Sequence, residues 1–167
     1  MHIIDKSFIS APRKYIVQSL FAVIAVALIL FFVEVLTHAA IVAALGASTF
    51  IVFAMPHSIT AQPRRLIGGH IIGLICGTFC YYAFLTGPLG ELSANWEYMP
   101  WFAGALSVGL SIFLMTITDT EHPPAASTAL GIALHIWSHE VVIFVLSFAV
   151  GLALIRRLLR GYLRDLF

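Results

Sequence analysis

All nine Lys and Arg residues of this 167-residue chain fall into three clusters, and the long apolar stretches between the clusters carry none. Hydrophobic residues make up 60% of the sequence and charged residues 10%, and the mean hydropathy is +0.99. Soluble domains contain roughly 25% charged residues. The sequence therefore predicts an all-α polytopic membrane protein. The clusters are Lys6, Arg13 and Lys14; Arg64 and Arg65; and Arg156, Arg157, Arg160 and Arg164.

Six membrane segments are expected, and they form one transmembrane domain over residues 15–158. The first is long enough to span a bilayer and too long for a cleavable signal peptide. Residues 1–14 form an N-terminal arm and residues 159–167 a basic tail. The segments are about 15–36, 39–56, 66–86, 100–118, 123–138 and 141–158.

The fifth segment is short for a membrane span. Its roughly sixteen residues give about 24 Å of helix, against a hydrocarbon core of about 30 Å. We expect a short or partial span there.

The charge pattern predicts an orientation. Six crossings place all three basic clusters on one side and the acidic residues Glu91, Glu97 and Glu140 on the other. By the positive-inside rule, both termini are expected in the cytoplasm. We expect a multi-pass protein of the bacterial cytoplasmic (inner) membrane.

A weak internal repeat relates the two halves of the chain. The triplet Ala47-Ser48-Thr49 in the second segment resembles Ala126-Ser127-Thr128 in the fifth. Repeat one covers about 15–86 and repeat two about 100–158. Because each contains three crossings, the repeats must be inverted, as in secondary transporters that build a midplane site from short or broken helices. The second element of each repeat is the short one.

Glycines at four-residue spacing mark the third segment. Gly69, Gly73 and Gly77 form a small-xxx-small face, which lets a neighbouring helix approach closely. Close helix packing is their expected role.

The stretch His122-Pro123-Pro124 reads as a helix start, because proline suits the first helical positions. The free N–H groups and positive dipole end of such a helix favour a small anion. Ser127 and Thr128 would add hydroxyl donors, and Ser48 and Thr49 would supply a mirror set.

Several of these residues have alternative interpretations. His122 could donate to an anion or carry a proton, or it could cap the turn by bonding Asp119 or Glu121. Arg64 could attract anions, or it could be a plain topogenic charge. An intramembrane imidazole such as His70 needs a partner. Ser and Thr hydroxyls often bond the carbonyl one turn back. Coupling or gating candidates are Glu34, Asp119 and Glu121.

Four motifs in fixed order resemble the HPP family of integral membrane proteins, over most of the chain. The motifs are Ala54-Met55-Pro56, Ala61-Gln62-Pro63-Arg64, Gly68-Gly69-His70 and His122-Pro123-Pro124-Ala125-Ala126. Arg65 stands where family members typically have Asn or a small polar residue. Some members are associated with nitrite transport, so the resemblance implies a transporter or channel for a small inorganic anion. The candidate substrate-binding residues are Ser48, Thr49, Gln62, Arg64, His70, His122, Pro123, Pro124, Ala125, Ser127 and Thr128.

Two other functions stay open. Seven histidines, with Asp119, Glu121 and His122 close together, allow a membrane-embedded metal-binding protein or divalent-metal carrier. Against this, no His-Glu-x-x-His pair occurs on a predicted helix. His135 and His139 are four residues apart, but His139 lies past the short helix, next to its turn. A non-transporting scaffold or sensor subunit is the other alternative.

No enzyme motif is recognised, neither Gly-x-Ser-x-Gly nor a phosphate loop. We expect no catalytic residues, no bound metal or other cofactor, and no nucleic-acid partner. The expected partners are a small inorganic anion and the lipid bilayer, and the small residues could also serve a homo-oligomer.

Overall fold

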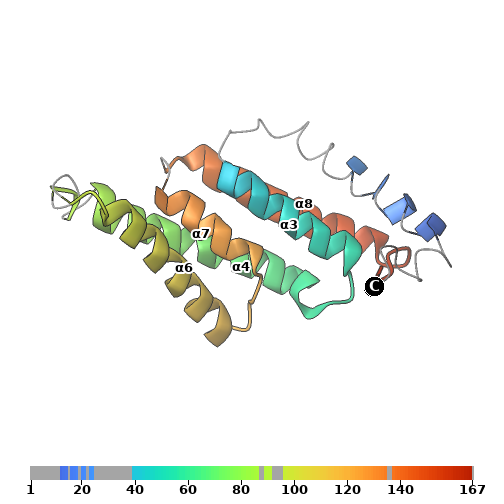
Figure 1. Cartoon of the computed structure of the whole chain (residues 1–167). Helices are drawn as coiled ribbons and strands as arrows, with labels where there is room; N and C mark the ends of the chain where they lie inside the picture. The colour runs from blue at the N-terminus through green and yellow to red at the C-terminus, as the bar shows by residue number, and fades with distance from the viewer. Residues whose placement is uncertain are drawn as a thin grey trace, which may run out of the picture.

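The computed structural model describes residues 12–14, 16–18, 20–21, 23–24, 39–86, 89–91, 96–134 and 137–166, and among them it contains helices and no strand (Figure 1). The principal elements are α3 (Ala39–Ala54), the 3₁₀ turn η1 (Ile59–Ala61), α4 (Pro63–Cys80), which continues as the π-helix η2 (Tyr81–Thr86), α6 (Met99–Ile117), α7 (Pro124–Leu134) and α8 (His139–Leu159).

Three of these helices are long and apolar enough to cross a membrane: Pro63–Thr86, Met99–Ile117 and His139–Leu159. The other two, α3 and α7, are shorter, with 16 and 11 residues. The predicted all-α structure is thereby confirmed for the described residues, with helices whose length and composition suit a membrane. The six-segment count stays a prediction, because most of the expected first segment, including Glu34, lies outside the described residues.

The contacts between α4 and α7 show that these helices run in the same direction. Gly69, near the start of α4, lies against His122, whereas Gly77, farther along α4, lies against Ala129 and Ile132. Positions advance along both helices together, so the two are parallel.

The helices α3, α6 and α8 run the opposite way. The end of α3 leads through η1 directly into α4. Arg64 at the start of α4 donates to the carbonyl of Thr118 at the end of α6, at 3.0 Å. Arg156 in the last turn of α8 donates to the carbonyl of Pro56, at 3.2 and 2.5 Å. Two inverted repeats require that the matched helices α3 and α7, and α4 and α8, run in opposite directions, as they do here. The repeat itself stays a prediction.

The described residues of all three basic clusters gather at one end of the bundle, which we call the basic end. Arg64 lines a cavity there with Arg156 and Arg160. Arg13 and Lys14 line a separate hollow with Tyr162. Figure 1 shows the blue N-terminal fragments beside the C-terminus. This arrangement is the one that six crossings predict, whereas the side of the membrane that the basic end faces stays a prediction.

The C-terminal tail packs against the end of α3. Gln18 donates to the carbonyls of Phe53 and Arg164, at 2.5 and 2.7 Å, and accepts from the Arg164 N–H at 3.0 Å. The N–H of Leu166 donates to the Ala54 carbonyl at 3.0 Å. These bonds satisfy carbonyls that the end of a helix leaves unpaired.

The short helix α7 is packed among α3, α4 and α6 (Figure 1). The glycine stripe of α4 makes this possible, as predicted. A Cβ on Gly73 would lie 2.4 Å from the Ala125 carbonyl oxygen, and one on Gly77 would lie 2.6 Å from that of Ala129. Only a residue without a side chain fits so close to a backbone. The fifth segment is therefore an interior helix.

Gly73→Ala is expected to destabilise the protein by about 1–3 kcal/mol, because the new methyl group must push α7 away from α4. Gly109→Ala is the matched control, since a Cβ there meets nothing within 4 Å. That change should be neutral or stabilising by up to about 1 kcal/mol. Thermal unfolding in detergent measures both, and equal melting temperatures for the two variants would contradict the packing argument.

Candidate functional site

Four polar side chains are buried where α3, α4 and the start of α7 meet. Ser48, His70, His122 and Thr128 are each 0% exposed. The bundle around them is apolar, and burying an unpaired hydroxyl or imidazole there would cost several kcal/mol at worst. These groups must therefore find partners within the protein.

The four side chains form one continuous chain of hydrogen bonds, which we call the histidine–serine network. Ser48 Oγ lies 3.0 Å from His70 Nε2 and 2.9 Å from His122 Nε2. His70 Nδ1 lies 3.0 Å from Thr128 Oγ1. His122 Nδ1 lies 3.0 Å from the carbonyl oxygen of Thr60 in η1.

Local sequence explains how His122 reaches the interior. α7 begins at Pro124, as the two prolines predict, so His122 lies just before the helix. A Cβ on Gly69 would lie 2.6 Å from the Cβ of His122. The glycine before His70 thus leaves the space that lets the two imidazoles approach, with ring centroids 5.2 Å apart.

The network has one consistent set of hydrogens when both imidazoles are neutral. The Thr60 carbonyl can only accept, so His122 Nδ1 carries a hydrogen and Nε2 must accept. Ser48 then donates its one hydrogen to His122. His70 must in turn donate from Nε2 to Ser48 and accept at Nδ1 from Thr128. Every donor points the same way, from Thr128 toward Thr60.

His122 lies in the connection before α7, and burial lowers its pKa to about 4, although the hydrogen bond to the Thr60 carbonyl acts in the opposite direction. A neutral imidazole at neutral pH agrees with the hydrogen-bond polarity.

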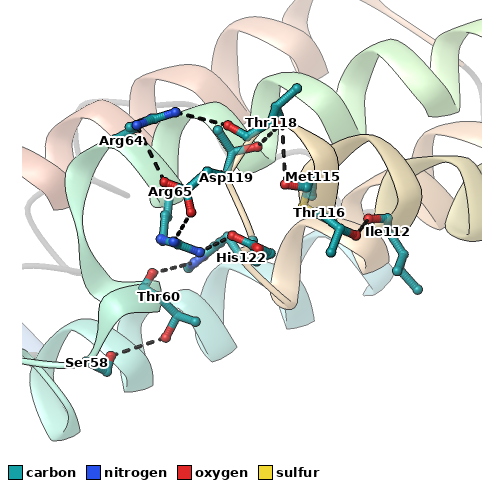
Figure 2. A network of polar contacts seen from close by, with 12 residues as sticks. Ser58, Thr60, Arg64, Arg65, Ile112, Met115, Thr116, Thr118, Asp119 and His122 are labelled. Carbon is teal, nitrogen blue, oxygen red and sulfur yellow. Dashed lines mark hydrogen bonds and ion pairs between the residues drawn. The ribbon is translucent and has the colours of Figure 1, made fainter.

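The charged turn between α6 and α7 is held to the start of α4 (Figure 2). Arg65 pairs with both Asp119 and Glu121, and Arg64 lies 3.5 Å from Asp119. Asp119 adopts a left-handed backbone, with φ 56°, which Asp tolerates better than most residues. His122 bonds Thr60 and Ser48, so it does not cap the turn through Asp119 or Glu121. These two gating candidates lie in ion pairs.

A cavity of about 390 Å³ opens at the basic end. Three arginines line it, and none of the described lining residues is a carboxylate, although Asp165 bonds the lining residue His57. Gln62 and Arg64 were predicted as site residues. Arg156 and Arg160 were missed, since the sequence suggested only a basic cluster at the end of the last segment and in the tail. The lining is Pro56, His57, Gln62, Pro63, Arg64, Arg156, Arg160 and Leu163.

The remaining predicted residues lie outside the network. Thr49 donates to the Leu45 carbonyl one turn back, at 2.9 Å. Pro123 and Ser127 are exposed. Pro124 and Ala125 are buried, and Ala125 packs against the glycine stripe of α4.

Of the two predicted sets of hydroxyl donors, Ser48/Thr49 and Ser127/Thr128, only Ser48 and Thr128 thus enter the network. The two hydroxyls are joined through His70. Sequence reasoning also missed the Thr60 carbonyl, which no side-chain motif could signal, and the double ion pair of Arg65.

Metal-ligand groups are sparse in the described part of the chain. No three His, Cys, Asp or Glu side chains come together there as a set that could hold an ion. Cys76 and Cys80 are buried free thiols. The metal-carrier alternative therefore has no donor cluster among the described residues.

Comparisons with known proteins agree with a membrane role. A family model described as "HPP, transmembrane region" matches residues 9–161. Two transmembrane proteins of Dictyostelium discoideum are similar. One is 39% identical over 90 residues, which are 54% of this chain and 28% of that protein. The other is 36% identical over 85 residues, which are 51% of this chain and 24% of that protein. The chain thus spans about a quarter of their length. No solved structure matches.

Thr128→Val is expected to destabilise the protein by about 1–3 kcal/mol, because it keeps the side-chain shape but leaves His70 Nδ1 without its donor. Ser127→Val at the exposed neighbouring position should stay within about 0.5 kcal/mol of wild type. Thermal or denaturant unfolding compares the two variants. Equal losses at both positions would exclude the assigned Thr128–His70 bond.

Proposed function

This chain belongs to the HPP transmembrane family, and on that premise we propose that it moves a small inorganic anion across the membrane, as a carrier or a channel. Nitrite is the first candidate, because the resemblance to the family suggests it. The observation that carries the proposal is the arginine-lined cavity at the basic end.

The charges around this cavity favour an anion. The guanidinium of Arg156 is held in place by the Pro56 carbonyl, so its position is preorganised. Arg64 and Arg160 are exposed at the same cavity. Asp119 offsets part of the charge of Arg64, and two further arginines remain. A concave site lined by one sign of charge raises the local concentration of the opposite ion.

A polar route from the cavity into the bundle supports transport rather than surface binding. Gln62 lines the cavity, and Thr60, two residues earlier, accepts from His122. From His122 the network continues through Ser48 and His70 to Thr128. We propose that the anion passes between the short helices α3 and α7, and that the two inverted halves rock or open to admit it.

The remaining parts of the proposal follow from charge and composition. The basic end would face the cytoplasm, under the positive-inside rule, in a bacterial inner membrane. The protein would act without catalysis, and copies could associate as a homo-oligomer.

Proteoliposomes containing the purified protein should take up nitrite faster than empty liposomes. Arg160→Gln is expected to lower the initial rate up to about tenfold at low salt, because it removes one charge from the cavity. Added salt should narrow the difference, since it screens exposed charges. Flux is followed with an anion-sensitive dye inside the vesicles.

Arg157→Gln is the matched control, since Arg157 is exposed on the same helix but does not line the cavity. Equal effects of the two variants on the initial uptake rate would argue against the cavity as the entrance for the anion. No flux of nitrite, nitrate or formate above empty liposomes would rule out the anion-transport proposal.

A further inference from the structure

The Ser48 hydroxyl has more partners than it has hydrogens. Its oxygen lies 2.9 Å from the Ala44 carbonyl, 3.0 Å from His70 Nε2 and 2.9 Å from His122 Nε2. A hydroxyl donates one hydrogen and accepts two. At any moment it can therefore donate to only one of the two groups able to accept, the Ala44 carbonyl or a deprotonated imidazole nitrogen.

These partners can satisfy the hydrogen bonds of the imidazoles in two charge states. With both imidazoles neutral, Ser48 donates to His122 and accepts from His70. If a proton from solvent bonds to His122 Nε2, that nitrogen becomes a donor, and Ser48 keeps its own hydrogen but turns it to the Ala44 carbonyl. Ser48 then accepts from both imidazoles. No hydrogen bond of an imidazole is lost in either state.

The distance between the two imidazoles limits the histidine–serine network to one added proton. The ring centroids of His70 and His122 lie 5.2 Å apart, so two charged imidazoles would repel each other inside the bundle.

Among the described elements packed around the histidine–serine network, no unpaired carboxylate is present that could take up the proton instead. α3, α6 and α7 carry no titratable side chain within their bounds, and η1 carries none. Asp119 and Glu121 are paired with Arg65. The other titratable groups on the adjoining helices are Arg64, Cys76 and Cys80 of α4 and His139, Glu140, Arg156 and Arg157 of α8.

We propose that Ser48, His70 and His122 form an internal binding site for one proton, in which the Ser48 hydroxyl switches its acceptor from His122 to Ala44, and that this proton moves together with the anion. The proton site stands on the network alone. Its coupling to an anion rests on the proposed function.

The coupling has a physical basis. Burial disfavours a charged imidazole when no anion is bound, whereas an anion bound nearby stabilises the charged imidazole. By linkage, the proton must then strengthen anion binding by the same factor. Anion and proton would cross as a neutral pair.

Nitrogen-15 histidine NMR of the protein in lipid nanodiscs tests the site. At neutral pH, His122 should carry its hydrogen on Nδ1 and His70 on Nε2. On acidification, the two rings should take up one proton between them, and nitrite should move this titration to higher pH. Ser48→Ala should uncouple the rings so that they titrate separately. Ser107→Ala on α6 should leave the spectra unchanged, because the Ser107 hydroxyl donates to the Gly104 carbonyl and lies outside the network.

The opposite tautomers, or independent titration of the rings in the wild type, would overturn the proton site without any measurement of transport.

Proteoliposomes test the coupling. An external pH below the internal pH should accelerate nitrite uptake in the wild type and in Ser107→Ala, and Ser48→Ala should lose this acceleration. Nitrite uptake that ignores the pH gradient in the wild type would overturn the coupling and leave the anion-transport proposal standing. The absence of any anion uptake would overturn that proposal and the coupling together, and the spectra would still decide the proton site.

Discussion

The need to pair polar groups inside an apolar bundle is the constraint on which the rest of this structure depends. Ser48, His70, His122 and Thr128 are all fully buried, and each bonds another member of the network. Because an unpaired group there is costly, the network holds α3, α4 and the start of α7 at a defined rotation and depth. Those three elements also define the proposed path.

Backbone contacts allow that network to form. The glycine stripe of α4 brings α7 so close that Gly73 meets the Ala125 carbonyl directly. Gly69 leaves room for His122 beside α4. At the charged turn, Arg65 pairs with Asp119 and Glu121. The packing therefore pairs the buried polar groups with one another, and the arginines line the cavity at the basic end.

The sequence alone determined the elements and the ends of the bundle that they reach. Apolar length predicted the helices, the two prolines predicted the start of α7 at Pro124, and four-residue spacing predicted the glycine packing face. The clustering of Lys and Arg predicted that Arg64 and the arginines of α8 lie at one end. The helices, the start of α7 and the glycine face each depend on a single segment, and the shared basic end depends only on the number of crossings, so none of them requires knowledge of how the helices are rotated.

Only the tertiary structure decided which side chains meet. Successive helical residues point about 100° apart, so two neighbouring hydroxyls face different surroundings. The Ala-Ser-Thr triplets therefore could not show that Ser48 and Thr128 enter the network while Thr49 and Ser127 do not. The partners of His122 are a serine 74 residues away and a backbone carbonyl. Such pairs depend on how the helices are rotated and packed, and no spacing within one segment encodes that.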